Sequence, residues 1–171
     1  MTARKKPPRT RVRKRSRADA DVPSTALDPG ILGDLAGYNI RRAEVHMRQQ
    51  FEREMGAKGL RPPEFSTLVL IATNPLATQA EIADALNIQR PNMVGLIGGL
   101  EERGLVTRTV YEHDRRNHIL ELTPRGAALL EEAKRVVREL DRRVTACWTD
   151  RERDQIVALL ARLWDPGGGG A

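Results

Sequence analysis

Apolar residues recur at steps of three and four positions along most of the chain, which predicts a mainly helical protein. The first such stretch begins after Asp28 and Pro29, an N-cap residue followed by a proline at the first helical position. At about 100° per residue, its apolar positions cover roughly 200° of the helix surface, wider than the stripe of a helix that packs on one core. We therefore predict a helix over residues 29–56 that is buried from two sides, by its own domain and by a second chain.

Capping and breaking residues divide the next part of the chain into two further helices. Pro62 opens the first of them, which ends before Pro75. Thr78 and Glu81 then form a capping box, in which each side chain accepts a hydrogen bond from a backbone N–H. This box predicts a short helix that extends to about Leu86.

A helix and a hairpin follow this short helix. A tight turn at residues 87–89 leads into a helix predicted over residues 90–103, which Gly104 can end in the left-handed conformation. Alternating apolar and polar residues then predict two strands, over residues 106–111 and 117–123.

The C-terminal part of the chain again has helical spacing. Thr123 and Pro124 are a helix start, and the apolar positions that follow predict a long helix over residues 124–148. Thr149 and Glu152 repeat the capping box, which predicts a last helix over residues 150–164.

The order of a short helix, a turn, a second helix and a two-stranded hairpin is that of a winged helix-turn-helix, predicted here over residues 62–123. The second helix of such a unit fits the major groove of DNA, and the hairpin can reach the sugar-phosphate backbone or the minor groove. The predicted fold class is therefore mainly α with a small β-hairpin wing, flanked by N-terminal and C-terminal helices.

The predicted hairpin tip, residues 111–118, reads YEHDRRNH. Arg115 and Arg116 would place two guanidinium groups where a narrow groove concentrates negative potential, and Asp114 can hold one of them through a bidentate pair. The same letters also suit a solvated turn, because Asp and Asn favour turns. The position of the tip after a helix-turn-helix favours the DNA-binding interpretation.

The net charge of +6 is concentrated at the start of the chain. Residues 1–18 contain nine Lys or Arg and no acidic residue, which leaves 20 of the 29 basic residues against 23 acidic ones, a formal charge of −3 for the rest. Residues 1–26 have few apolar side chains, so we predict a disordered basic tail that either solubilises the protein or neutralises DNA phosphates. The glycine-rich residues 166–171 are predicted to be flexible.

Composition narrows the classes of function. Cys147 is the only cysteine, which excludes an internal disulfide and favours a reducing compartment. The histidines are scattered, and no catalytic Ser/His/Asp set or phosphate-binding glycine loop can be placed, so we predict no metal, no cofactor and no enzyme. No apolar run has the length of a membrane span or the form of a signal peptide, which predicts a cytoplasmic protein. Cys147 itself falls at core spacing late in the predicted long helix, where a buried, inert thiol is expected and an oxidant sensor is the alternative.

Four motifs give the chain a resemblance to the MarR family of bacterial winged helix-turn-helix transcription regulators. They are TQAEIA, LEERGLV, DRR in the hairpin and LTPRG before the long helix, and the resemblance covers about Leu27 to Trp164. It implies a MarR-type domain over residues 27–165 that forms an obligate homodimer through its first, fifth and sixth helices. These dimerisation helices are residues 29–56, 124–148 and 150–164. The dimer would present two winged heads, about 34 Å apart, to a pseudo-palindromic operator in double-stranded DNA.

The resemblance also implies roles for individual residues. The start of the second helix of the unit would face base edges, because Arg pairs with guanine and Gln or Asn pairs with adenine. The implied base-reading residues are Gln89, Arg90 and Asn92. The implied phosphate-contacting residues are Thr78, Arg103 and Arg108. On the wing, Arg115 and Arg116 would reach the narrow groove, with Asp114 holding one of them in place. Two alternatives stay open: Gln89 only closes the turn, and Arg103 is a solvated cation that favours the negative end of a helix dipole.

Members of the family are often released from DNA by small phenolic or aromatic carboxylate ligands. The stretches GYNIRRAEVHM, PPEFSTLVLIATNP and RPNMVGL resemble more specifically the subset linked to aromatic-acid catabolism. On the first helix, a cation and an imidazole border the apolar arc, which suits an aromatic acid. The implied ligand-binding residues are Tyr38, Asn39, Arg42 and His46, and the alternative is that they are ordinary surface or interface groups.

The sequence thus predicts a sequence-specific DNA-binding transcription regulator, a repressor that a small aromatic or phenolic acid releases. The alternative from another class is a winged-helix protein-interaction module whose basic tail binds nucleic acid non-specifically. The slightly acidic body fits this alternative better than a uniformly basic body would.

Overall fold

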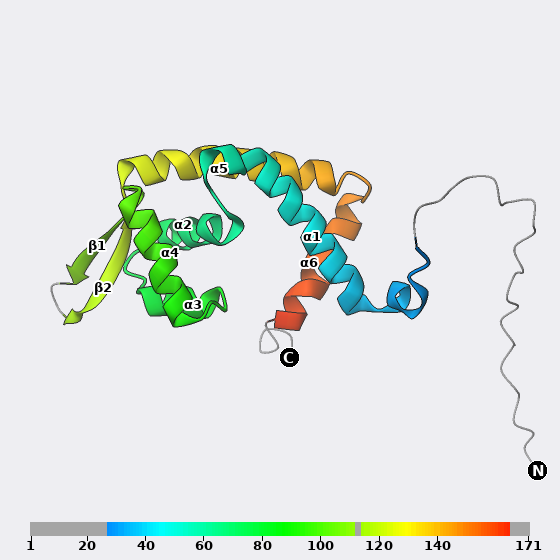
Figure 1. Cartoon of the computed structure of the whole chain (residues 1–171), viewed down its shortest axis with the longest axis horizontal. Helices are drawn as coiled ribbons and strands as arrows, with labels where there is room; N and C mark the ends of the chain where they lie inside the picture. The colour runs from blue at the N-terminus through cyan, green and yellow to red at the C-terminus, as the bar shows by residue number, and fades with distance from the viewer. Residues whose placement is uncertain (1–26, 112–113, 165–171) are drawn as a thin grey trace, which may run out of the picture. The chain divides into compact units, whose positions relative to one another are not determined.

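The computed structural model describes residues 27–111 and 114–164, apart from the side chains of residues 110–118 (Figure 1). The predicted basic tail over residues 1–26 and the predicted flexible residues 166–171 lie outside this range. The chain divides into two compact units, the first ending at Asn39 and the second beginning at Ile40.

The first unit corrects the predicted start of the first helix. A 3-10 helix, η2 (Gly30–Asp34), comes first, and α1 (Ala36–Met55) begins after the extended residue Leu35. Asp28 is not the N-cap of α1, since its Oδ1 accepts a hydrogen bond from Gly30 N, at the start of η2, at 2.9 Å. Gly30 has a φ of +54°, a left-handed conformation that a continuous helix from Pro29 could not contain. The predicted start at Pro29 is therefore wrong.

The C-terminal end of α1 enters the core of the second unit through Phe51 and Met55, which are both buried. The predicted break follows directly, as a short 3-10 helix η3 (Gly56–Lys58) and a left-handed residue, Gly59. Elsewhere along α1 several apolar side chains stay exposed on their own chain, for example Ile40 at 39% and Met47 at 38%. The cover that a second chain would give this face remains a prediction.

The winged helix-turn-helix has the predicted order, which confirms the fold class. Its elements are α2 (Pro62–Thr73), α3 (Gln79–Ala85), α4 (Arg90–Glu102), β1 (Val106–Tyr111) and β2 (Asp114–Leu122). The capping box of α3 is confirmed, because Thr78 N donates to Glu81 Oε2 at 2.7 Å and Glu81 N donates to Thr78 Oγ1 at 3.3 Å. Gly104 has a φ of +65° and ends α4 as predicted.

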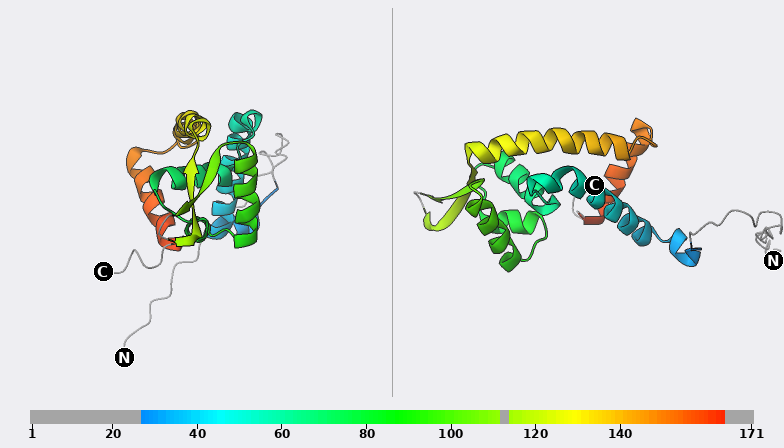
Figure 2. Two further views of the ribbon diagram at one scale, coloured as in Figure 1. Left: turned by 90° about the vertical axis from the view of Figure 1, so that its left-hand side faces the viewer. Right: turned by 45° about the horizontal axis from the view of Figure 1, so that its top comes forward.

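The described strands form a two-stranded antiparallel sheet, drawn as two arrows in Figure 2. Val106 pairs with Leu122 at its base, and a register irregularity follows Val110. β2 begins at Asp114 and not at residue 117, because Tyr111 pairs with Asp114 beyond this irregularity. An isolated bridge between Thr78 and Ile119 attaches the start of α3 to the wing.

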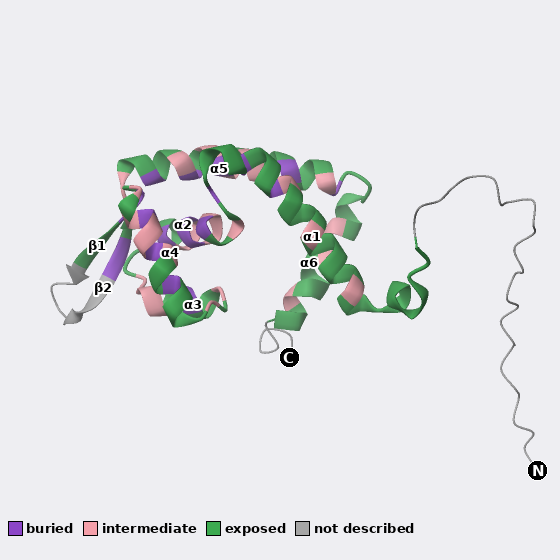
Figure 3. Cartoon of the chain, viewed as in Figure 1, coloured by how far each residue is buried: buried purple, intermediate pink, exposed green. Residues whose placement is uncertain are grey.

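The core lies between the inward faces of these helices and the base of the wing (Figure 3). Its residues have almost no exposed surface, and dispersion and the hydrophobic effect together hold the helices at fixed separations. The largest fully buried apolar side chains are Met55, Leu60, Leu68, Met93, Ile97, Leu100, Leu130 and Val106.

The long helix α5 (Pro124–Val144) ends earlier than predicted, and α6 (Asp150–Trp164) matches its prediction. The residues between them form a turn, in which Thr145 Oγ1 donates to the carbonyl of Asp141 at 2.8 Å. Thr149 N donates to Glu152 Oε2 at 2.8 Å, and this second capping box needs a non-helical residue before α6. Cys147 therefore lies in the turn, and it is exposed on this chain, so the prediction of a buried helical thiol is wrong.

The first turn of α5 packs tightly on the turn between α4 and β1. Thr123 Oγ1 accepts from Gly126 N at 2.9 Å and donates to the carbonyl of Gly104 at 2.7 Å. A Cβ atom at Gly126 would lie 1.9 Å from the carbonyl oxygen of Leu105, closer than any real contact. The glycine of LTPRG is thus required by the approach of one backbone to another.

Replacing Gly126 with alanine should destabilise the protein by about 1–3 kcal/mol or more, because the backbone of Leu105 must move. Gly98→Ala is the matched control within α4, since no described neighbour comes within 4 Å of its Cβ position. That substitution should leave the free energy of unfolding unchanged or raise it by about 0.5–1 kcal/mol, the helix propensity difference. Urea denaturation of both variants measures this, and equal effects of the two would contradict the packing argument.

Candidate nucleic-acid interface

The helix α4 has a buried face and an exposed face. Met93, Ile97 and Leu100 have no exposed surface and anchor α4 on the core. The predicted base-reading residues Gln89, Arg90 and Asn92 all lie in the N-cap and first turn of α4, and all are exposed. The structure therefore leaves all three side chains outside the core, as the inward periodicity predicts.

The side chains of this first turn are held only weakly by their own chain. Arg90 Nη2 lies 3.7 Å from Asp84 Oδ2, but both side chains are about 70% exposed, so solvent screens the pair and it contributes little. Gln89 makes no capping hydrogen bond through its side chain within the described part of the chain. The polar ends of both residues can therefore reorient towards base edges, and the idea that Gln89 serves only to close the turn gains no support from its side chain.

The outward face beyond this first turn carries little side chain. Gly95 is exposed opposite the buried face and Gly98 is half-buried beside it, and no described neighbour lies within 4 Å of where their Cβ atoms would be. Val94 is 51% exposed and was not among the predicted site residues, although its place outside the inward period could have identified it. An apolar side chain there suits contact with a thymine methyl group. The side chains that α4 offers for contact with another molecule are therefore concentrated between residues 89 and 94.

Thr78, a predicted phosphate partner, is engaged within its own capping box. Its N–H donates to Glu81 Oε2, and its Oγ1 also donates to that oxygen at 2.8 Å. The hydrogen bond from the Thr78 backbone, and then that from its side chain, hold the pKa of the Glu81 carboxyl below its usual range. A phosphate contact at Thr78 would have to compete with this carboxylate.

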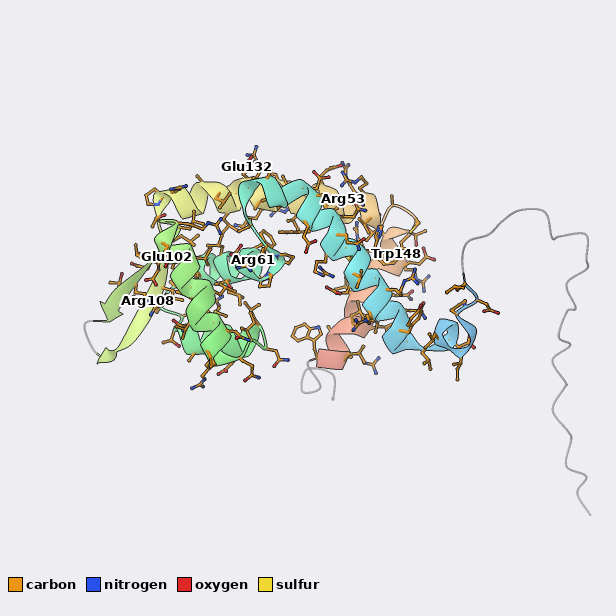
Figure 4. The ribbon with its side chains drawn as sticks, in the orientation of Figure 1. Arg53, Arg61, Glu102, Arg108, Glu132 and Trp148 are labelled. Carbon is orange, nitrogen blue, oxygen red and sulfur yellow. The ribbon has the colours of Figure 1, made fainter. Side chains whose placement is uncertain are left out.

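Arg103 and Arg108, the other predicted phosphate partners, each face a carboxylate. Arg108 on β1 places its Nε 2.9 Å from Glu101 Oε2, and Figure 4 shows its position on the wing. Arg103 is the C-cap of α4, and its Nη1 lies 3.4 Å from Glu64 Oε1. Both side chains are only 33% exposed, so Arg103 is not the solvated helix-end cation of the alternative interpretation.

The strand β2 includes the three predicted wing residues, Asp114, Arg115 and Arg116. They are therefore not in a loop between the strands, which corrects the predicted tip, because the pairing of Tyr111 with Asp114 starts the strand there. Their side chains lie outside the described residues, and the proposed aiming of the arginines by Asp114 stays a prediction.

The predicted ligand-binding residues all lie on α1. Arg42 and His46 are exposed, and Tyr38 is half-buried. Asn39 makes hydrogen bonds to nearby backbone: its Nδ2 donates to the carbonyls of Gly33 and Leu35, at 2.9 Å each. These bonds connect η2 to the start of α1. Tyr38, Arg42 and His46 follow one another at four-residue steps and so form a line along one face of the helix.

The described residues form neither a candidate metal site nor a membrane-spanning helix. No three His, Cys, Asp or Glu side chains in this part of the chain gather as the ligands of a metal ion would. None of the described helices combines the length and the apolar character that crossing a membrane requires.

Comparison with known proteins agrees with this geometry. The sequence profile of the MarR family matches residues 58–117. A putative transcriptional regulatory protein for the hcr operon of Thauera aromatica is 30% identical over 154 residues, which cover 90% of this chain and 93% of that protein.

Two solved structures are similar over the same region. The transcriptional repressor CouR, bound to a 23-mer DNA duplex, is 38% identical with a TM-score of 0.77, and the match covers 81% of this chain and 99% of CouR. CouR bound to p-coumaroyl-CoA is 37% identical with a TM-score of 0.73, over 81% of this chain and 97% of that one.

A winged helix-turn-helix with an exposed polar first turn on α4 defines the chain as a DNA-binding protein of the helix-turn-helix class. The similarity over nearly the whole length of its relatives makes the assignment specific: the chain belongs to the MarR family. It is a transcription regulator and not an enzyme.

The capping box of α3 should make stability depend on pH in a defined direction. Because the folded pKa of Glu81 is lowered from about 4.5, its stabilising effect is present above that pH and is lost as the pH falls through the folded pKa. Glu81→Gln keeps an acceptor for Thr78 but cannot titrate. The free energy of unfolding of the natural protein should therefore exceed that of the variant at pH 7, and this difference should shrink below about pH 4.5.

Glu152→Gln should behave in the same way, since hydrogen bonds from Thr149 lower the pKa of Glu152. Urea titrations between pH 3 and pH 7 (about the range in which the carboxyl groups titrate) test both variants. A stability difference that stays constant over this range would show that the charge of the cap has no effect.

Proposed function

We propose that the protein is a homodimeric, cytoplasmic, sequence-specific repressor that binds a pseudo-palindromic operator and is released by an aromatic or phenolic acid. The observation that carries the DNA-binding part is the exposure of Gln89, Arg90 and Asn92 at the start of α4, whose inward face is buried. In this proposal α4 is the recognition helix. The similarity to CouR bound to a DNA duplex supports the same assignment. In this proposal Thr78 and Arg108 lie beside phosphates, and Arg115 and Arg116 reach the adjacent minor groove.

The second chain is inferred from apolar surface that this chain leaves uncovered. None of the described residues of α6 is buried, and three of its large apolar side chains are more than 60% exposed: Val157, Leu163 and Trp164 (Figure 3). Full burial of each such side chain contributes a favourable free energy of about 1.5–3 kcal/mol. An amphipathic helix with this much exposed apolar surface is expected to pack on another protein surface, and the twofold symmetry of family operators points to a second copy.

Substitutions can separate base reading by the first turn of α4 from DNA contacts made by the wing. Arg90→Ala should weaken binding to the operator by about tenfold or more and relax the base preference at one position of each half-site, because a bidentate base contact is lost. Arg115→Ala and Arg116→Ala should weaken operator binding while the dimer stays intact. Fluorescence anisotropy with DNA from upstream of the protein's own gene, and with single-base variants of the protected site, measures these effects.

Arg151→Ala is the control, since Arg151 is an exposed arginine on α6 and far in sequence from the winged head. It should leave operator affinity unchanged. Unchanged affinity in the Arg115 and Arg116 variants would remove the wing from the DNA interface. Absence of any protected inverted repeat with the natural protein would contradict operator binding itself.

The effector is inferred from α1 and from a relative. Tyr38, Arg42 and His46 line one face of α1 with an aromatic ring, a cation and an imidazole, groups that suit an aromatic ring and an acidic group. CouR, 37% identical to this chain, has been solved with p-coumaroyl-CoA. We infer that the effector is an aromatic acid, taken either as the free acid or as its thioester with coenzyme A.

Adding the effector should release the protein from its operator. p-Coumaroyl-CoA and free p-coumarate, titrated separately into the protein–operator complex, distinguish the two forms. Arg42→Ala and His46→Ala should raise the effector concentration needed for release by about tenfold, while DNA affinity without effector is unchanged. Arg41→Ala, the loss of a neighbouring exposed arginine on a different face of α1, is the matched control. Failure of both compounds to release DNA would overturn the effector class and leave operator binding in place.

A further inference from the structure

Glu64 is a buried carboxylate at the start of α2, with only 5% of its surface exposed. Its Oε2 accepts a hydrogen bond from Arg61 N at 2.8 Å, which is the reciprocal bond of a capping box. Its other oxygen, Oε1, has a different use. It accepts from Arg61 Nη2 at 3.0 Å and lies 3.4 Å from Arg103 Nη1.

The carboxylate therefore joins two elements that are far apart in the sequence. Arg61 belongs to the linker between α1 and α2, where Figure 4 shows it, and Arg103 is the C-cap of α4. A Cβ atom at Gly59 would lie 3.8 Å from Arg103 Nη2, so the guanidinium also lies alongside the linker. An ion pair with one partner this deeply buried is screened less by solvent than a surface pair, so its loss has a larger effect.

The geometry points to Glu64 as a positioning residue for DNA reading: it holds Arg103 and so fixes the orientation of the recognition helix α4. This inference rests on the proposed base reading by the first turn of α4. It gives Arg103 a role within the protein in place of a phosphate contact.

The length of α4 explains why a contact at its C-terminal end matters at its N-terminal end. Its 13 residues span about 20 Å. A tilt of about 5° around the C-cap would displace the first turn by roughly 1.7 Å over this length. Hydrogen bonds to base edges tolerate distance changes of only about 0.5 Å, whereas phosphate attraction falls off slowly with distance. Loss of the Glu64–Arg103 pair should therefore reduce specific binding and spare non-specific binding.

The test compares Glu64→Gln, Arg103→Gln and the double variant on operator DNA and on a random duplex of the same length. In Glu64→Gln the side-chain amide oxygen would still accept the capping hydrogen bond from Arg61 N, so the substitution mainly removes charge. Each single variant should lose about tenfold in operator affinity and show unchanged affinity for random DNA. The double variant should be no weaker than either single variant, because both remove the same interaction.

The ratio of operator affinity to random-duplex affinity separates positioning from a general loss of structure. A smaller folded fraction lowers both affinities equally and leaves the ratio unchanged, so a fall in the ratio reports the orientation of α4. Glu131→Gln is the matched control, because it removes an ion pair with Lys134 that lies within one turn of α5 and links no two elements. That variant should keep the natural ratio.

Two results would overturn the inference. In the first, Glu64→Gln keeps the natural ratio, with or without a general loss of affinity. In the second, Arg103→Gln weakens binding to both duplexes and lowers the slope of log affinity against log salt by about one, which identifies Arg103 as a phosphate contact. If the natural protein itself does not prefer the operator, the proposed DNA reading fails, and this outcome is distinct from both.

Discussion

The first turn of α5 approaches the carbonyl group of Leu105 so closely that a side chain at position 126 has no room. Thr123 closes the same junction from the other side, since its N–H donates to the carbonyl of Leu105 at 3.1 Å. Leu105 joins the end of the recognition helix to the first strand of the wing, so three elements meet within a few residues. Because backbone touches backbone there, no flexible side chain can absorb a change of spacing. The orientation of the head relative to α5 depends on this junction.

A second set of contacts, ionic in kind, holds the linker between α1 and α2. Lys58 Nζ lies 2.6 Å from Glu132 Oε1 on α5, and this lysine holds the pKa of the Glu132 carboxyl below its usual range. Slightly further along the chain, the carboxylate of Glu64 forms ion pairs with both Arg61 and Arg103. The linker is thus tied to the long helix on one side and to the recognition helix on the other. A change in the position of α1 would reach both through charged side chains, in contrast to the backbone contact at Gly126.

The sequence predicts those parts of the fold that short-range hydrogen bonding decides. The capping boxes at Thr78 and Thr149 and the glycine end of α4 need only residues three or four positions away, so their signals are local. The start of α1 and the end of α5 are different, because apolar periodicity continues past the points where the backbone leaves the helix. For the site, inward spacing of α4 correctly exposes Gln89, Arg90 and Asn92. The pairing of Arg103 with Glu64 depends on tertiary contact between distant segments, and no local pattern contains it.

The open surface of the recognition helix has an evolutionary consequence. Gly95 projects no side chain from the outward face of α4, and a Cβ atom placed there would touch no other described residue. Under the proposed DNA reading by α4, a larger residue at this position would add a contact to DNA without disturbing the core, and it would also raise helix propensity. Regulators descended from this one therefore have a position at which operator preference can change in a single step with no loss of stability. Most positions on the buried face of α4 offer no such freedom.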